Sequence, residues 1–184
     1  EADESRKISP FEDMGLLELI EKTGIAEAIK DRLASLSGSR GAIAETIENN
    51  VRSKIIKEQL TDPAYYEKMS VLLDEIIATR KAKAIEYEEY LQQIADLAKR
   101  VQTGQAEGTP DGIDTQGRNA LYNNLGEDAD LAIKVDEAVR ISRPDSWRGV
   151  QAKEQVVKRA IYEVLPNEGE VERIFLIIKA QGEY

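Results

Sequence analysis

The sequence of 184 residues contains no cysteine and no histidine. Without cysteine the chain can form neither a disulfide nor a thiolate nucleophile, and without histidine it lacks the usual general base of hydrolases. Together the two absences exclude the common zinc sites. No apolar run is long enough to span a membrane and no signal peptide is visible, so we expect a cytoplasmic protein without a membrane partner.

Positive charge is also in short supply. The sequence has 35 acidic and 25 basic residues, which gives a formal net charge of -10. Such a charge opposes attraction of the whole surface to nucleic acid or anionic lipid. The chain begins Glu1-Ala2-Asp3-Glu4 and lacks an initiator methionine, so we expect it to be a fragment of a larger protein.

Motifs for nucleotide and metal chemistry are missing as well. None of the twelve glycines is followed by lysine, which excludes a phosphate-binding P-loop. Pro110-Asp111 and Pro144-Asp145 could each begin a metal-dependent nuclease signature, but no acidic-x-Lys follows either pair. We therefore expect no catalytic, cofactor-binding or metal-binding residue in this chain.

What the sequence does have is helical patterning with only five prolines. Ile43, Ile47, Val51 and Ile55 lie four residues apart and predict one buried helical stripe. The patterning predicts an all-α protein, an irregular helical bundle in two lobes. The predicted parts are a linker tail over 1–10, an N-terminal helical lobe over 11–102, a flexible loop over 103–117 and a C-terminal helical lobe over 118–184.

The N-terminal lobe is predicted to contain one very long helix, from about residue 62 to 102. Asp62 and Pro63 form a helix start signal, and neither glycine nor proline occurs between Pro63 and Thr103. Arg80 and Lys83 interrupt the apolar stripe at the middle of this window. A break of the helix near that point is therefore the alternative interpretation.

The C-terminal lobe is predicted to hold short helices over 118–125, 128–141, about 147–165 and 171–180. The last of these is apolar nearly all round, because Leu176 and Ile177 fall off its main stripe. It is either central in the core or docked on a partner.

Residues 140–159 form a basic segment in this acidic chain. Two interpretations remain open, a contact to a phosphate backbone or acidic partner and a solvated helix face. The candidate partner-binding residues, opposed only by Asp145 and Glu154, are Arg140, Arg143, Arg148, Lys153, Lys158 and Arg159.

Trp147, the only tryptophan, lies inside this segment. We expect it to sit in the first turn of a helix capped by Asp145 or Ser146, as a core anchor, while Arg148, Lys153 and Arg159 project outward. A hot spot for a partner is the alternative for the indole.

Four blocks of sequence, in order, resemble the C-terminal region of the R subunits of type I restriction enzymes. The blocks are Ala44-Glu45-Thr46-Ile47-Glu48-Asn49-Asn50-Val51-Arg52, Asp62-Pro63-Ala64-Tyr65-Tyr66-Glu67-Lys68-Met69-Ser70, Ala120-Leu121-Tyr122-Asn123-Asn124-Leu125-Gly126, and Asp145-Ser146-Trp147-Arg148-Gly149 with Lys153 and Val157-Lys158-Arg159-Ala160-Ile161. The last residues, 179–184, are also similar to the end of that family. The resemblance covers the chain from about Leu16 onward, except for the loop over 104–117.

The resemblance implies a non-catalytic helical domain that follows the motor of an ATP-dependent DNA translocase and nuclease. ATP and magnesium would then belong to the rest of the R subunit. The implied partners are the methyltransferase subunits M and S and the remainder of the R subunit, with DNA contact secondary. Two further hypotheses remain open, an element along the DNA path and a structural cap on the motor domains.

Overall fold

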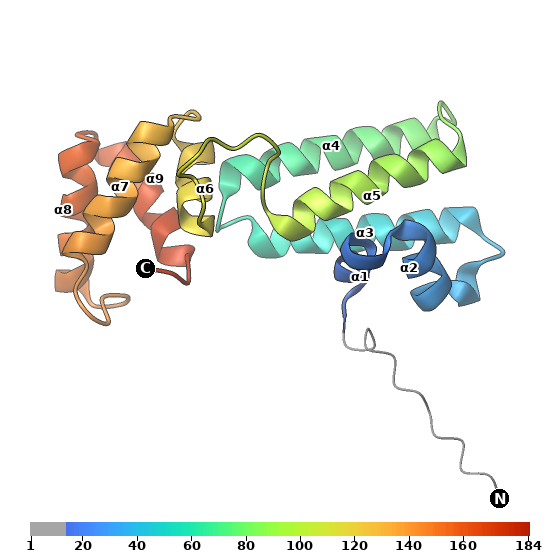
Figure 1. The fold of residues 1–184 in the computed structure, drawn as a ribbon, viewed down its shortest axis with the longest axis horizontal. Coiled ribbons are helices and arrows are strands. Elements are labelled where there is room, and N and C mark those ends of the chain that lie inside the picture. The colour runs from blue at the N-terminus through green and yellow to red at the C-terminus, as the bar shows by residue number, and fades with distance from the viewer. Residues whose placement is uncertain (1–13) are drawn as a thin grey trace, which may run out of the picture. The chain divides into compact units, whose positions relative to one another are not determined.

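A computed structural model describes residues 14–184 of the chain, and over these residues it is all-helical with no strand. The predicted linker tail over 1–10 lies outside the described residues. The elements are α1 (Leu16–Thr23), α2 (Ile25–Arg32), the 3-10 turn η1 (Ala34–Leu36), α3 (Arg40–Glu58), α4 (Pro63–Lys81), α5 (Tyr87–Thr103), α6 (Gln116–Asn124), α7 (Ala129–Ser142), α8 (Gln151–Val164) and α9 (Glu168–Ala180) (Figure 1).

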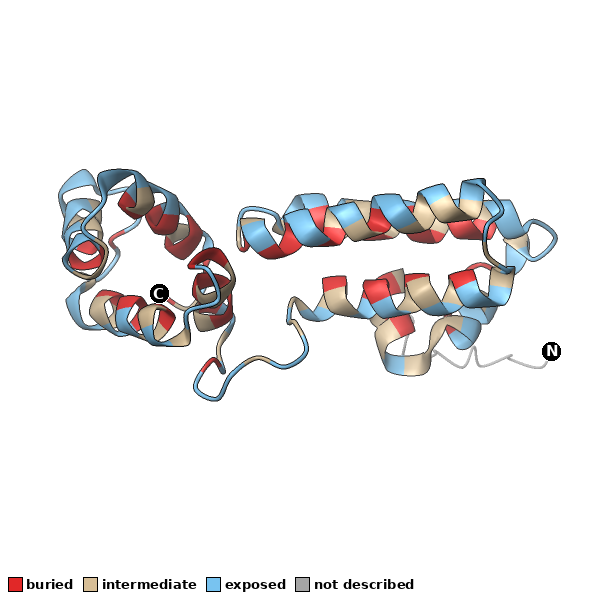
Figure 2. Cartoon of the chain, turned by 90° about the horizontal axis from the view of Figure 1, so that it is seen from above, coloured by how far each residue is buried: buried red, intermediate tan, exposed pale blue. Residues whose placement is uncertain are grey.

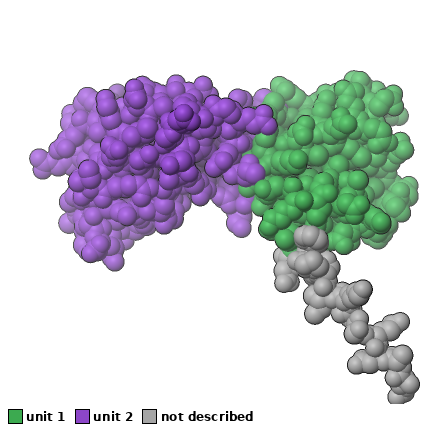
Figure 3. All heavy atoms as spheres, viewed as in Figure 1, with its two compact units in different colours: residues 1–53, 72–102 green, residues 54–71, 103–184 purple. Residues whose placement is uncertain are grey.

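The contacts divide the chain into two compact units (Figure 3). Within the described residues, unit 1 comprises 14–53 and 72–102, and unit 2 comprises 54–71 and 103–184. The division differs from the predicted lobes, because residues 54–71 group with the C-terminal helices rather than with the rest of the N-terminal lobe.

The predicted long helix over 62–102 is wrong. Two helices, α4 and α5, run in opposite directions and are joined by a turn at residues 82–86 (Figure 1). Lys83 adopts a left-handed conformation with φ 53°. Its N–H donates to the carbonyl of Arg80 at 3.0 Å, and the N–H of Ala84 donates to the carbonyl of Thr79 at 3.1 Å. This pair of hydrogen bonds is the Schellman motif that ends helices, formed here without glycine.

Unit 1 is built on buried stripes of α3 and α5. Ile43, Ile47 and Val51 are at most 4% exposed, which confirms this part of the predicted stripe. One buried polar group lies among them, Glu48. The guanidinium of Arg80 donates to both oxygens of Glu48 at 2.7 and 2.8 Å, and the hydroxyl of Tyr90 donates at 2.8 Å. A buried carboxylate costs little when it is paired and hydrogen-bonded in this way, so the network joins α3, α4 and α5.

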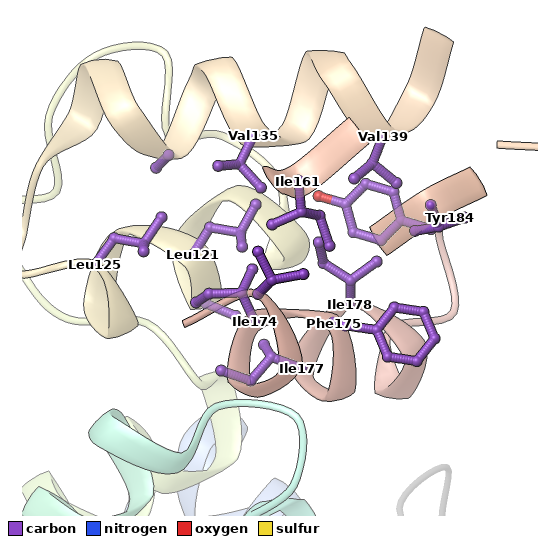
Figure 4. Packing of buried hydrophobic residues seen from close by; sticks show 14 of the residues in the cluster. Leu121, Leu125, Val135, Val139, Ile161, Ile174, Phe175, Ile177, Ile178 and Tyr184 are labelled. Carbon is purple, nitrogen blue, oxygen red and sulfur yellow. The ribbon is translucent and has the colours of Figure 1, made fainter. Parts of the chain in front are cut away.

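Unit 2 contains a four-helix arrangement in which α6 packs on α7, α7 on α8, α8 on α9, and α9 back on α6. Its core is apolar and includes Leu121, Val135, Ile161, Ile174 and Ile178 (Figure 4). Ile177 is buried in the same core, whereas Leu176 is 61% exposed. The last helix is therefore central in unit 2 and still presents an apolar side chain to solvent.

The start of α4 is tied to α6 by a buried carboxylate. Asp62 caps α4 as predicted, because its side chain accepts from the N–H of Tyr65 at 3.2 Å. It also accepts from the side-chain amides of Asn123 and Asn124 at 2.8 and 2.7 Å. No cation pairs with Asp62 among the described residues, and burial raises its pKa from 3.8 to about 6.

Side-chain contacts hold the segment between α5 and α6 in unit 2. The hydroxyl of Tyr65 donates to the backbone carbonyl of Gln105 at 3.1 Å. The side-chain amide of Asn119 donates to the backbone carbonyl of Gly104 at 2.9 Å. Arg118 donates to the carbonyl of Gly112 at 2.9 Å. The helix that follows begins at Gln116, capped by Thr115, two residues earlier than expected.

Candidate partner-binding surface

The six candidate basic residues fall into two groups in unit 2. Arg140, Arg143, Arg148 and Lys153 make contacts with the last residues of the chain or with the loop before α8. Lys158 and Arg159 line a groove between α8 and α9. The two groups differ in how far their charged groups already bind other residues of unit 2.

Arg148 binds the C-terminal segment, defined here as residues 179–184. Its guanidinium donates to the backbone carbonyls of Lys179, Gln181 and Tyr184. Burial, and then the neighbouring charge of Arg143, lower the pKa of Arg148. The expectation that Arg148 projects freely outward is therefore wrong, because three carbonyls occupy its donors.

Arg140 and Arg143 hold the same segment from α7 and its C-terminal cap. Arg143 donates to the carbonyl of Glu183 at 2.8 Å, and Arg140 forms an ion pair with the Glu183 side chain. Arg140 also pairs at 3.0 Å with Asp136, which is fully buried and accepts from the Tyr184 hydroxyl. These contacts give Arg140 and Arg143 a structural part inside unit 2.

Trp147 lies in the loop before α8, not in its first turn. The helix begins at Gln151, and its N-cap, Val150, makes no side-chain capping hydrogen bond, so the predicted cap by Asp145 or Ser146 is wrong. The indole is 2% exposed and its ring centre lies 5.8 Å from that of Phe175. Trp147 therefore belongs to the core of unit 2, as the structural interpretation expected.

Lys153 secures this loop, since its ammonium group donates to the carbonyl of Asp145 at 2.7 Å. The backbone turns sharply just before it, with Ser146 at φ 50° and Gly149 at φ 79°. Like Arg148, Lys153 is not free to project outward, because it holds the loop in this conformation.

The α8–α9 groove has a volume of about 420 Å³. Its residues follow helical spacing on both walls, so it runs along the two helices. They are Gln155, Lys158, Arg159 and Tyr162 on α8 and Glu168, Val171 and Glu172 on α9.

The walls of the groove carry opposite charges. The ionisable groups that α8 contributes, apart from a tyrosine, are Lys158 and Arg159, and those of α9 are Glu168 and Glu172. Lys158 and Glu172 form an ion pair at 2.9 Å across the groove. Arg159 is 84% exposed, and its one ion pair among the described residues is to Glu163, which is itself 71% exposed, at 3.8 Å. Exposed pairs of this kind are worth little, so Arg159 remains available to a partner.

Apolar surface accompanies these charges. Tyr162, which lines the groove, is 47% exposed. Exposed residues occur on the helices of both units (Figure 2). The large hydrophobic side chains that are exposed within residues 14–184, however, all belong to unit 2 (Figure 3). They are Ile56, Leu60, Val71, Ile141, Val150, Val156, Tyr162 and Leu176.

Sequence reasoning missed Tyr162 although a signal was present. The buried face of α8 is made of Val157, Ala160 and Ile161, and Tyr162 lies off that face. A large aromatic side chain on the solvent side of an amphipathic helix is a common mark of an interface.

No group of three or more acidic side chains within residues 14–184 is arranged to hold a metal ion. Nor does any helix of that range combine the length and hydrophobicity that crossing a membrane requires. Comparisons of the chain with known protein families, with curated proteins and with solved structures gave no match.

Proposed function

We propose that this chain is a non-catalytic docking module, the C-terminal helical domain of a type I restriction enzyme R subunit. In this role it attaches the ATP-dependent translocase and nuclease to the methyltransferase core of M and S subunits. The family assignment rests on the four sequence blocks that resemble such R subunits. One structural observation supports a docking role, the concentration of exposed apolar side chains in unit 2.

Single exposed apolar side chains are common on monomeric proteins and need no partner to explain them. In unit 2 one of them, Tyr162, is 47% exposed and lines a groove beside charged side chains, and this feature favours a binding surface. We assign Lys158 and Arg159 to the partner surface. Arg140, Arg143, Arg148 and Lys153 act inside unit 2, where they hold the C-terminal segment and the loop before α8.

The alternative in which the chain contacts duplex DNA has weaker support. A DNA contact depends on cations that neutralise phosphates. Of the six candidates, Arg159 is the one whose guanidinium is both largely exposed and held only by a long, solvated ion pair. The net charge of -10 adds a repulsive background. A structural cap on the motor domains would use the same apolar side chains, with the rest of the R subunit as the partner.

The test is a titration of the 184-residue chain with the purified complex of M and S subunits and, separately, with duplex DNA. We expect the complex to bind more tightly than DNA at both about 50 mM and about 200 mM salt, because the net charge of -10 opposes DNA binding. Any DNA binding should also fall steeply between these two concentrations. Tighter binding to DNA near physiological salt would contradict the docking function. Binding to neither, together with binding to the motor part of the R subunit, would support the structural cap instead.

A further inference from the structure

The α8–α9 groove combines three features that constrain what it can bind. It has the half-exposed ring of Tyr162 beside the buried Val171, a positive wall on α8 and a negative wall on α9. Both walls are single helices whose lining residues recur at three or four positions. A ligand that lies along the groove therefore meets the ring of Tyr162 and opposite charges on its two sides.

We propose that the groove binds an amphipathic helix of the partner protein, with acidic residues along one edge of its apolar face and basic residues along the other. The inference rests on the proposed docking function and adds the surface and the chemistry of the partner segment. A helix presents an apolar stripe flanked by polar edges, so it matches a groove of this kind.

The charge arrangement selects this occupant over a uniformly charged one. A phosphate backbone or an acidic surface would gain from Arg159 but would be repelled by Glu168 on the opposite wall. A basic surface would be attracted by Glu168 but repelled by Arg159. Lys158 and Glu172 already form an ion pair with each other at 2.9 Å. Arg159 and Glu168 are therefore the charged groups of the groove that can interact with the partner.

Tyr162 supplies the anchor of the groove. Its side chain lines the groove and is 47% exposed. A tyrosine in that state can bury its ring on binding and exchange water for a partner group at its hydroxyl, as residues at the centres of interfaces do. Beside it Lys158 is held by its ion pair with Glu172 and by the ring of Phe175, whose centre lies 4.8 Å from the ammonium group.

The test compares charge reversals on the two walls, with the purified M and S complex as the probe. We expect Arg159→Glu and Glu168→Lys each to weaken binding, because each places a like charge against one edge of the partner helix. The affinity loss should appear in the association rate and shrink with added salt, as expected for charges at the rim of an interface. Tyr162→Ala should weaken binding at least about tenfold, in line with the truncation of an interface anchor.

Two matched charge reversals serve as controls, Lys134→Glu and Glu137→Lys. Both side chains are exposed on α7 and neither lines the groove. We expect both controls to bind like the wild type. Circular dichroism of each variant checks that the helices are intact, and Arg159→Glu keeps the test valid if Tyr162→Ala unfolds, because Arg159 is 84% exposed.

Each outcome has one meaning. If Glu168→Lys strengthens binding while Arg159→Glu weakens it, the partner surface is uniformly acidic and this inference is overturned. The reverse pattern indicates a basic partner and overturns it equally. If wild type and all groove variants bind alike, the docking function stands but the groove is not its site. If the wild type does not bind the complex, the proposed function fails, and this inference fails with it.

Discussion

At the scale of single residues, the side chains of Arg148 and Arg159 show how similar residues take different parts. Both are basic, both are close in sequence, and the sequence pattern predicts the same role for them. Arg148 donates to three backbone carbonyls of the C-terminal segment, whereas Arg159 has one long ion pair to a solvated glutamate. The difference depends on where residues 179–184 pass, which no local pattern reveals.

This contrast gives a prediction for stability. Arg148→Gln should lower the free energy of unfolding by about 1–2 kcal/mol, since a hydrogen bond contributes about 1 kcal/mol net and the side chain is partly exposed. Arg159→Gln, the matched control on α8, should change it by less than about 0.5 kcal/mol. Urea unfolding followed by circular dichroism measures both. Equal values for the two variants would mean that the carbonyl contacts of Arg148 contribute nothing.

A second residue, Asp62, should make stability depend on pH. Burial raises its pKa from 3.8 to about 6, so the folded state holds the proton more tightly than the unfolded state. Its contribution to stability is present below about pH 4 and is lost as the pH rises through 6. The shift corresponds to about 3 kcal/mol as an upper limit.

The matched variant is Asp62→Asn, which removes the titration while keeping a side-chain oxygen for the cap. We expect the wild type to lose stability relative to this variant between pH 4 and pH 7. Any hydrogen bond lost in the variant is a constant offset and cancels in the comparison across pH. A difference that stays flat over this range would show that the carboxylate of Asp62 is not desolvated as described.

At the scale of secondary-structure elements, the turn between α4 and α5 shows where sequence reasoning stops. The stretch Lys81-Ala82-Lys83-Ala84 contains good helix formers and no glycine or proline, so its propensities favour a continuous helix. The one opposing signal was the interruption of the apolar stripe by Arg80 and Lys83. In the fold Arg80 binds the buried carboxylate of Glu48. The chain reverses direction between α4 and α5, so that the hydroxyl of Tyr90 binds the same carboxylate. Tertiary contacts thus override local preference.

Lys83→Gly distinguishes a turn between α4 and α5 from one continuous helix, because it should change the thermal midpoint in opposite directions in the two cases. Lys83 has φ 53°, a conformation that costs a side chain about 1 kcal/mol or more and glycine almost nothing. We expect the variant to raise the thermal midpoint or leave it unchanged. In a continuous helix the same change would cost about 1 kcal/mol. A clear drop in the midpoint by calorimetry would therefore favour the single long helix.

Lys81→Gly is the matched control for that experiment. Lys81 is the last residue of α4 and is exposed, and the left-handed conformations recorded among residues 14–184 do not include it. Glycine there should destabilise the chain, because glycine gives the unfolded state more conformational entropy, which is lost when the helix forms.

At the scale of the whole molecule, the fold class could be predicted and the binding surface could not. Periodic apolar residues and few prolines indicate helices whatever their partners are, and residues 14–184 are all-helical. Circular dichroism should therefore show a helical fraction far above the globular average of about one third. A spectrum dominated by strand would contradict the fold.

The candidate surface needed the tertiary structure, because its two walls come from helices whose facing sides are set by packing. Lys158 and Arg159 were identified from the charge pattern. Glu168, Glu172 and Tyr162 were not, since nothing in the sequence places them across from those cations. The grouping of residues 54–71 with unit 2 was missed for the same reason, as it depends on the contacts of Asp62 with Asn123 and Asn124.

Engineers who stabilise helical proteins by replacing helix glycines with alanine would meet opposite results at two equivalent positions of this chain. Gly41 and Gly117 are each the second residue of a helix, α3 and α6. A methyl group at 41 would meet open space, so Gly41→Ala should stabilise the chain by up to about 1 kcal/mol. The same group at 117 would lie within 3 Å of the Glu183 and Tyr184 side chains. Because those groups bind Arg140 and Asp136, Gly117→Ala should displace them and lower the thermal midpoint. A helix-propensity scale alone would therefore recommend the wrong residue there.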